Sequence, residues 1–163
     1  AQSVQDQIAK TADLGRSLGL THSLFGNEDD PHLWNQLREQ MTVATDPDTI
    51  TCKIGIRPAD AIALFSKLDS FAFTSWSGQI HAASGLGRLM IRDANLQPEL
   101  MSKIRAQCVA SAGFLSVLSA PVAFKKSFDA WGTVGNALDT MRQIKQRFDP
   151  EYRLSPHRFV GGI

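Results

Sequence analysis

The sequence has few cysteines, and no metal or redox motif surrounds them. Cys52 and Cys108 lie far apart in the chain and in apolar surroundings, so they fit neither a Cys-x-x-Cys pair nor a disulfide framework. We therefore expect both to be reduced core residues in a cytoplasmic protein. No apolar run approaches the roughly 18 residues of a membrane span. Residues 1–10 lack the basic and then apolar order of a signal peptide.

Neither sign of charge is in excess. The 163 residues include 17 Lys and Arg against 16 Asp and Glu, a formal net charge of +1. Nucleic-acid binding calls for a clustered basic face, so we expect no nucleic-acid partner. With 43% hydrophobic residues, a chain of this length can bury a sizeable core in one domain. Because the sequence begins at Ala1 rather than at Met, we expect it to be part of a longer polypeptide.

Two helices are expected before the first strand. Apolar residues recur at helical spacing over residues 3–18, and Gly19 follows as a usual helix end. Asp30 and Pro31 can begin a second helix, which continues to Met41. The stretch that follows is loop-like. We therefore treat residues 1–49 as a helical lead-in and linker, and residues 50–163 as the main domain.

The clearest strand covers residues 50–57. Apolar residues alternate through it with polar residues or glycine, which predicts a strand with one solvated face. The apolar positions are Ile50, Cys52, Ile54 and Ile56. Pro58 then opens a short helix that closes at Asp69. Its expected core face consists of Ala61, Ile62, Phe65 and Leu68.

Two further strands are expected over residues 71–76 and 79–92, joined as a hairpin by a turn at Ser77-Gly78. Gly85 and Gly87 inside the second strand indicate a bulge or a close backbone approach. They do not indicate a phosphate-binding loop, because Met90 stands where the third glycine of that motif belongs and no helix start follows.

The remaining pattern completes an α+β fold. A helix after Pro98 places Leu100, Ile104 and Cys108 on one face, and the apolar run 114–120 is short enough to be a buried strand. The order from residue 50 is strand, helix, strand, strand, helix, strand. This order predicts a ferredoxin-like split β-α-β fold, an antiparallel sheet with helices on one face. An additional helix over 134–148 has an apolar stripe made of Val134, Leu138, Met141, Ile144 and Phe148.

No metal site is expected from the histidines. His81 is the only histidine inside a strong strand, and a metal would need at least two more ligands at a recognisable spacing. His22, His32 and His157 lie in or beside loop-like stretches without a histidine or glutamate partner.

Cations gather on two of the expected strands. Lys53 and Arg57 share the polar face of one strand, and Arg88 and Arg92 share one face of another. Such a sheet face either meets an anionic ligand or a partner surface, or it is simply solvated.

The C-terminal residues carry a family resemblance. The motifs are, in chain order, Ser119-Ala120-Pro121, Phe128-Asp129-Ala130-Trp131-Gly132, Met141, Ile144-Lys145, Phe148-Asp149-Pro150 and Arg158-Phe159-Val160-Gly161-Gly162-Ile163. In this order they closely resemble the C-terminal end of FAD-linked oxidases of the glycolate oxidase type, in the vanillyl-alcohol oxidase superfamily. The smaller flavin-binding subunit is the most similar. Residues 80–87 are a weaker match to a glycine-containing strand of the same family.

The resemblance implies that residues 50–163 form the C-terminal cap or substrate domain, which closes over FAD. In that family a pyrophosphate-binding FAD domain precedes the cap on the same polypeptide, and these 163 residues do not supply its glycine-rich loop. The intact protein would oxidise a 2-hydroxy acid such as glycolate by hydride transfer to the flavin. It would assemble with sister subunits, and this domain would be inert alone.

The resemblance also implies roles for particular residues. The family's Asn-Pro-Gly-Arg segment, which approaches the flavin, is Ser155-Pro156-His157-Arg158 here. Ser155, Pro156 and Arg158 are therefore the expected cofactor-binding residues, with a hydroxyl replacing the amide and a histidine replacing the glycine.

Lys53, His81 and Arg88 are the candidates for the substrate side of the flavin. Some relatives hold a divalent metal through paired histidines and an acid on the cap sheet. His81 stands alone in this sequence, so we expect no metal.

Two other functions stay open at this point. The departures at Ser155 and His157 suit a non-catalytic scaffold subunit, which has lost the flavin contact and assembles with flavoprotein partner subunits. A ferredoxin-like regulator that binds a hydroxy acid or an amino acid is the third possibility.

Overall fold

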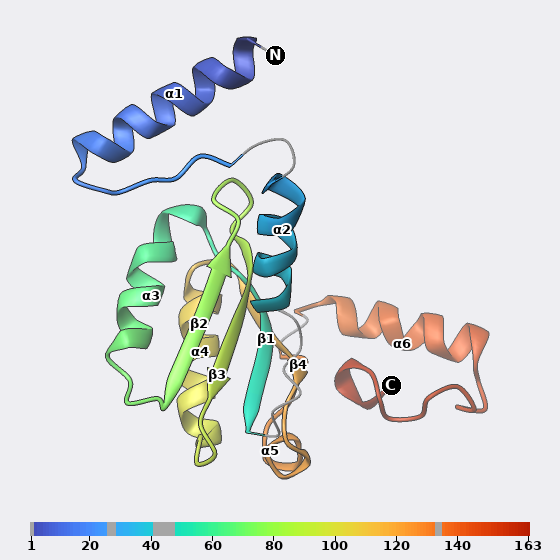
Figure 1. Ribbon diagram of the computed structural model, residues 1–163. Coiled ribbons are helices and arrows are strands. Elements are labelled where there is room, and N and C mark those ends of the chain that lie inside the picture. The colour runs from blue at the N-terminus through green and yellow to red at the C-terminus, as the bar shows by residue number, and fades with distance from the viewer. Residues whose placement is uncertain (1, 26–28, 41–47, 133–134) are drawn as a thin grey trace. The chain divides into compact units, whose positions relative to one another are not determined.

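Residues 2–25, 29–40, 48–132 and 135–163 are described by the computed structural model of this chain (Figure 1). Their contacts divide the chain into two compact units, Ala1–Gln40 and Met41–Ile163. The first unit contains α1 (Gln2–Ser17) and α2 (Asp29–Gln40), so both expected N-terminal helices are confirmed. Most of the expected loop at 42–49 lies outside the described residues.

The second unit is built on a four-stranded antiparallel sheet, which confirms the α+β prediction. The strands are β1 (Thr49–Gly55), β2 (Ser75–Ile80), β3 (Leu86–Arg92) and β4 (Phe114–Ser119). They lie in the order β2-β3-β1-β4, and each neighbouring pair is antiparallel. β1 and β2 therefore run in the same direction with β3 between them.

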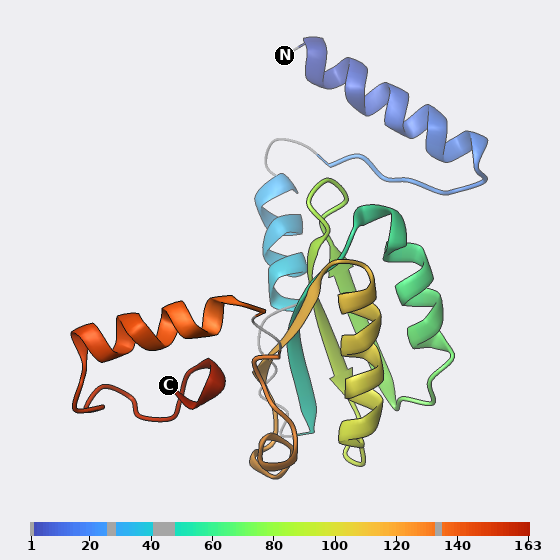
Figure 2. The ribbon, with the colours of Figure 1, turned by 180° about the vertical axis from the view of Figure 1, so that it is seen from behind.

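Helices cover one face of this sheet. α3 (Ala61–Asp69) follows a 3-10 turn, η1 (Pro58–Asp60), and connects β1 to β2, while α4 (Pro98–Ala110) connects β3 to β4. Figure 2 shows α3 and α4 side by side in front of the strands. The chain then continues through α5 (Val122–Ser127), α6 (Ala137–Phe148) and a second 3-10 turn, η2 (Val160–Gly162).

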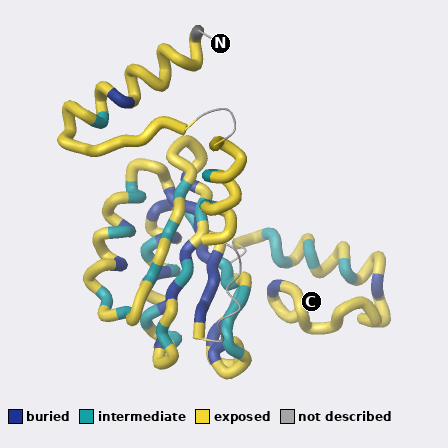
Figure 3. Tube along the Cα trace, viewed as in Figure 1, coloured by how far each residue is buried: buried dark blue, intermediate teal, exposed yellow. Residues whose placement is uncertain are grey.

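The core lies between the sheet and these two helices (Figure 3). Alternate residues of β1 point into it, as the period-2 pattern predicts. Its most buried members are Ile50, Cys52, Ile54, Leu68, Leu89, Ile91, Met101, Ile104, Cys108 and Leu115. Cys52 and Cys108 are both free and buried, as expected. Burial raises the pKa of the Cys52 thiol to about 12 and that of Cys108 to about 11.

The predicted core face of α3 is wrong at one position. Ile62 is 80% exposed, whereas Leu64 and Leu68 are buried. Residues 61, 64, 65 and 68 follow the 3.6-residue period more closely than a face that includes residue 62. The helix is therefore rotated relative to the prediction.

The hairpin is present, but its turn is displaced. Ser77 and Gly78 lie inside β2, and the chain reverses at residues 81–85. There His81 N donates to Leu86 O at 2.8 Å, and Gly85 N donates to His81 O at 2.9 Å. Gly85 has a φ of +70°, and a Cβ on it would come within 1.8 Å of the Ile56 carbonyl oxygen. The close backbone approach is confirmed there, while the unbroken β2–β3 register shows no bulge.

Burial on the other elements also differs from the sequence pattern. Thr51 on the expected solvated face of β1 is 0% exposed, whereas Lys53 on the same face is exposed, so this face is solvated only in part. β4 is an edge strand, so Leu115 is its one buried residue. α6 has no buried residue, and Ile144 and Phe148 of its expected core stripe are exposed. Val134 of that stripe lies outside the described residues.

Candidate functional site

Polar and cationic residues share the sheet face opposite α3 and α4, named here the polar face. Lys53 on β1 is paired in register with Arg88 on β3 and with Ser116 on β4, and Arg88 is paired with Gln79 on β2. Residues paired across antiparallel strands point to the same face. Two of the three substrate-side candidates, Lys53 and Arg88, are therefore brought together.

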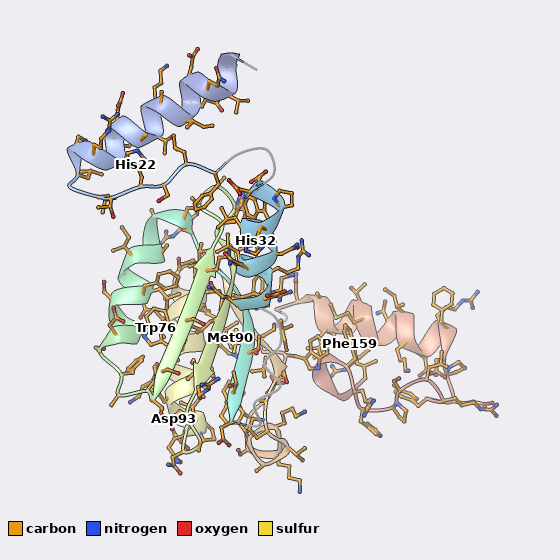
Figure 4. All side chains as sticks on the ribbon, in the orientation of Figure 1. His22, His32, Trp76, Met90, Asp93 and Phe159 are labelled. Carbon is orange, nitrogen blue, oxygen red and sulfur yellow. The ribbon has the colours of Figure 1, made fainter. Side chains whose placement is uncertain are left out.

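The next residues along β1 add hydroxyl groups to the polar face. Thr49 and Thr51 are 5% and 0% exposed, and neither Oγ1 has a hydrogen-bond partner within the described part of the chain. Thr51 is paired in register with Met90, which Figure 4 labels. A buried hydroxyl without a partner is costly. The sequence pattern gave no sign of these two groups, because a strand with one wet face predicts exposed threonines.

Arg57 was expected on the polar face with Lys53, and this prediction is wrong because β1 ends at Gly55. Its Nε lies 2.9 Å from Asp60 Oδ2, and its backbone N–H donates to Ser111 Oγ at 3.1 Å. Ser111 Oγ also donates to the Asp60 carboxylate. The hydrogen bonds from Ser111 and Arg57 hold the pKa of Asp60 below its ordinary value. This cluster joins the start of α3 to the end of α4.

His81, the third substrate-side candidate, lies in the β2–β3 turn rather than inside a strand. Its Nδ1 accepts a hydrogen bond from the Ser84 backbone N–H at 3.2 Å, with Ser84 Oγ at 3.1 Å. Because a backbone N–H can only donate, the neutral ring carries its proton on Nε2. His81 can thus present a donor to a ligand at the exposed turn.

A second candidate region is an apolar groove of about 600 Å³ between α6 and the C-terminal tail, named here the C-terminal groove. Its lining residues are Met141, Ile144, Lys145, Phe148, Asp149, Leu154, Ser155, Arg158, Phe159 and Ile163. Two of the three predicted cofactor-binding residues, Ser155 and Arg158, are in this set, and Pro156 is not. The groove volume is within the range of small-molecule sites, about 300–1,000 Å³.

An ion pair forms part of the lining of the C-terminal groove. Lys145 Nζ lies 2.5 Å from Asp149 Oδ2, and the two side chains are only 14% and 9% exposed. Asp149 also accepts the backbone N–H groups of Arg153 and Leu154 at 2.9 and 3.0 Å. The hydrogen bond from Lys145, followed by those from the tail, lowers the pKa of Asp149. Asp149 thereby fastens the end of α6 to the tail.

The tail adopts a backbone conformation that L-residues seldom take. Ser155 has a φ of +46° and His157 a φ of +61°. His157, at the position where the resemblance expects a glycine, has the left-handed conformation that glycine favours. Its Nδ1 lies 3.2 Å from the Gly162 carbonyl oxygen, a contact that helps to hold this strained turn.

The tail is also tied to the residues that follow β4. Trp131 Nε1 donates to the Arg158 carbonyl oxygen at 3.3 Å, and the Trp131 and Phe159 rings meet at 5.0 Å, edge to face. Figure 4 shows Phe159 on the tail next to α6. The Trp131 side chain is 45% exposed and belongs to the surroundings of the C-terminal groove.

The described residues contain no group of three or more His, Cys, Asp or Glu side chains that could hold a metal ion. His32 lies near the start of α2, with its Nε2 3.0 Å from Gln36 Nε2. Among the described helices, none is long and apolar enough to cross a membrane.

Comparison with known proteins identifies no relative: no family model, no curated protein and no solved structure matches this chain.

Proposed function

We propose that residues 50–163 are the cap domain of an FAD-dependent 2-hydroxy-acid oxidase or dehydrogenase subunit of the glycolate oxidase type. The observation that carries this proposal is that Ser155 and Arg158 both line the C-terminal groove. Sequence resemblance alone selected these two residues as flavin contacts. Because these two residues are close in sequence, their proximity to each other is no evidence for a site. The support comes from the apolar, ligand-sized groove that both of them line.

The sheet topology supports the same family. We propose that it is the ferredoxin-like split β-α-β arrangement, with α3 and α4 as its two crossover helices. The order β2-β3-β1-β4 places β3 between the parallel strands β1 and β2, as a split β-α-β unit requires. The resemblance implies an α+β cap domain, and this arrangement is of that class.

The C-terminal groove suits one part of FAD and not the whole cofactor. Its apolar lining suits the edge of a flavin ring, while Ser155 and Arg158 in the same lining offer hydrogen-bond donors. No glycine-rich loop is available for the pyrophosphate. In this proposal an N-terminal FAD-binding domain of the same polypeptide holds the rest of the cofactor, and FAD supplies the hydride acceptor.

The polar face is the proposed substrate side. Lys53 and Arg88 are paired in register and carry two positive charges, which suit the carboxylate of a 2-hydroxy acid. His81 in the neighbouring turn offers an Nε2 donor to the substrate hydroxyl. These residues would bind and orient the acid, and this part of the protein would be inert without the flavin domain.

The exposed apolar residues of α6 and the tail support a missing neighbour. Ile144, Phe148, Leu154 and Phe159 are 55%, 81%, 69% and 46% exposed around the C-terminal groove. Contiguous apolar surface of this kind marks an interaction site. We propose that the FAD-binding domain covers it, that sister subunits complete a cytoplasmic complex, and that neither nucleic acid nor membrane is a partner.

The test is to express the full reading frame that contains these residues and to record its absorption spectrum. We expect one flavin per polypeptide, with bleaching of the flavin band when a 2-hydroxy acid such as glycolate is added without an electron acceptor. The 163-residue chain alone should be folded and colourless. A full-length protein whose flavin is not reduced by any 2-hydroxy acid would contradict the proposed substrate.

A scaffold subunit is the second candidate, favoured by the serine and histidine at positions 155 and 157. It predicts a full-length protein that assembles with its sister subunits and binds no FAD. That result would replace the oxidase proposal.

A further inference from the structure

The two edge strands of the sheet, β2 and β4, differ in whether other residues bind their outward backbone groups. The edge formed by β4 is covered. Val117 N donates to Ala130 O at 2.7 Å, and Arg105 Nε donates to Leu115 O at 3.2 Å. Ser116 Oγ donates to Trp131 O at 3.1 Å. These contacts occupy outward groups of β4 with Arg105 and the segment 128–132. A further strand cannot pair there without displacing them.

β2 forms the other edge. His81 N donates to Leu86 O, which fixes the phase of the β2–β3 ladder, because hydrogen-bonded pairs recur at every second residue. Ser75, Ser77 and Gln79 therefore turn their backbone groups toward β3. The backbone groups of residues 76, 78 and 80 point away from the sheet. They have no hydrogen-bond partner in the ranges that the structure describes.

β2 also lacks the features that usually prevent an exposed edge strand from pairing with another chain. Its sequence, Ser-Trp-Ser-Gly-Gln-Ile, contains no charged residue and no proline. Its register with β3 runs without a bulge. Natural proteins block free edges with lysine, proline, bulges or a covering segment. An edge with none of these is suited to pairing with another strand.

We propose that β2 is the pairing edge of a symmetric dimer, in which β2 of a second copy of this chain adds antiparallel and extends the sheet. The two-fold axis passes through Gly78. Trp76 then stands opposite the partner's Ile80, and Ser77 stands opposite the partner's Gln79. The helix layers of both copies lie on the same side of the joined sheet.

β2 is complementary to itself, so a second copy of this chain is the partner that fits this edge. In this register each outward N–H of residues 76, 78 and 80 meets an outward C=O of the partner strand, and none is left over. Trp76 with Ile80 is an aromatic and β-branched pair, a favourable cross-strand combination. Serine faces glutamine on the polar face, so no like charges meet. The net charge of +1 gives little repulsion between two copies.

α3 adds surface beside the proposed axis. Phe65 of α3 packs on Trp76 of β2 with ring centroids 5.5 Å apart, so α3 accompanies β2 to the interface. Figure 1 shows α3 next to β2 at that edge of the sheet. Strand pairing alone buries less than the roughly 1,200 Å² of a stable interface, and the two α3 helices would supply the remainder.

The dimer does not rest on the proposed oxidase function. Sedimentation equilibrium of the 163-residue chain over micromolar concentrations should give twice the monomer mass of 17.8 kDa. Hydrogen exchange gives a second readout on the unaltered protein. The amides of residues 76, 78 and 80 should exchange slowly in the dimer and faster on dilution, whereas the amides that donate to β3 should not change.

Charge substitutions test the register. Ser77→Lys together with Gln79→Lys places like charges opposite each other across the axis, and should raise the dissociation constant about tenfold or more. Ser77→Glu together with Gln79→Lys places opposite charges there and should keep the dimer. Gln143→Lys together with Gln146→Lys adds the same charge to exposed positions of α6 and should leave the mass unchanged.

Three outcomes would overturn the proposal. One is a monomer at every concentration, and another is a dimer whose amides at 76, 78 and 80 exchange freely. The third is a monomer whose β2 amides become protected only with a sister subunit, which would assign this edge to a different partner. Thermal unfolding of each variant separates loss of the dimer from loss of the fold.

Discussion

The indole N–H of Trp131 donates a hydrogen bond to the backbone carbonyl of Arg158. Trp131 belongs to the segment that covers the β4 edge, and Arg158 to the tail that lines the C-terminal groove. The shape of the groove therefore depends on a contact with the sheet-forming part of the chain. Such a tie orders the tail, because segments near a chain end are otherwise poorly ordered.

Trp131→Phe should loosen the tail without unfolding the sheet. Phenylalanine keeps a ring against Phe159 but removes the donor, and one hydrogen bond contributes about 1 kcal/mol, or roughly a fivefold change in opening. Hydrogen exchange of residues 154–163 measures this effect. Trp34→Phe is the control, because Trp34 is 57% exposed on α2. Equal exchange of the tail in the two variants would show that the indole contact does not hold it.

Acid should release the tail through Asp149. The folded-state pKa of Asp149 is lowered by Lys145 and the tail amides. Its contribution to stability is therefore present above the unfolded value of about 3.9 and is lost as the pH falls through the lower folded value. We expect exchange of residues 151–158 to accelerate below about pH 4.

Two asparagine variants isolate this effect. Asp149→Asn should already show fast exchange of the tail at pH 7, with little further change in acid. Asp139→Asn is the matched control on the same helix, since the Asp139 carboxylate pairs with Arg142 among the described residues and is 84% exposed. An unchanged acid response in Asp149→Asn would assign the transition to another carboxyl group, such as that of Asp60.

The rotation of α3 can be tested with two residues of one helix. Leu68 is 0% exposed, so Leu68→Ala should lower the free energy of unfolding by about 2–5 kcal/mol. Ile62 is 80% exposed, and Ile62→Ala should stay within about 0.5 kcal/mol. Urea unfolding of both variants gives the comparison. Similar losses of unfolding free energy in the two variants would show that Ile62 lies on the buried face of α3, as the sequence predicted.

The phase of α3 illustrates which features the sequence could and could not predict. Alternation over residues 50–56 identifies β1 and its core face, because a strict period of two places all the apolar residues on one face of a strand. A nine-residue helix with several adjacent apolar residues is compatible with more than one face, and packing against β2 selects among them. The burial of Thr51 was missed because alternation separates the two faces of a strand but does not reveal how far the polar face is covered.

The candidate site was partly predictable. Lys53 and Arg88 are brought together because strand pairing follows the alternation that the sequence contains. The turn was misplaced because Ser77-Gly78 has the composition of a turn, whereas the close approach of Gly85 to Ile56 is a tertiary contact. The C-terminal groove depends on Asp149 capturing the tail amides, and no local spacing rule predicts that contact.

Both thiols should resist modification in the folded protein. With pKa values raised to about 12 and about 11, Cys52 and Cys108 carry almost no thiolate at pH 8. We expect a disulfide exchange reagent such as dithionitrobenzoate to react at least about a hundredfold more slowly than with a free thiol. Denaturant should expose both. Prompt reaction of either thiol in the folded state would show that the core opens readily.

The most direct measurement of the proposed flavin contact is FAD affinity of the full-length polypeptide with single substitutions in the tail. Arg158→Ala should weaken FAD binding about tenfold or more, since it removes charged hydrogen bonds, and Ser155→Asn should keep or improve it. Arg142→Ala, which removes a charge from α6 outside the groove, should bind as the unaltered protein does. Unchanged affinity in Arg158→Ala would contradict the assignment of the C-terminal groove to the flavin.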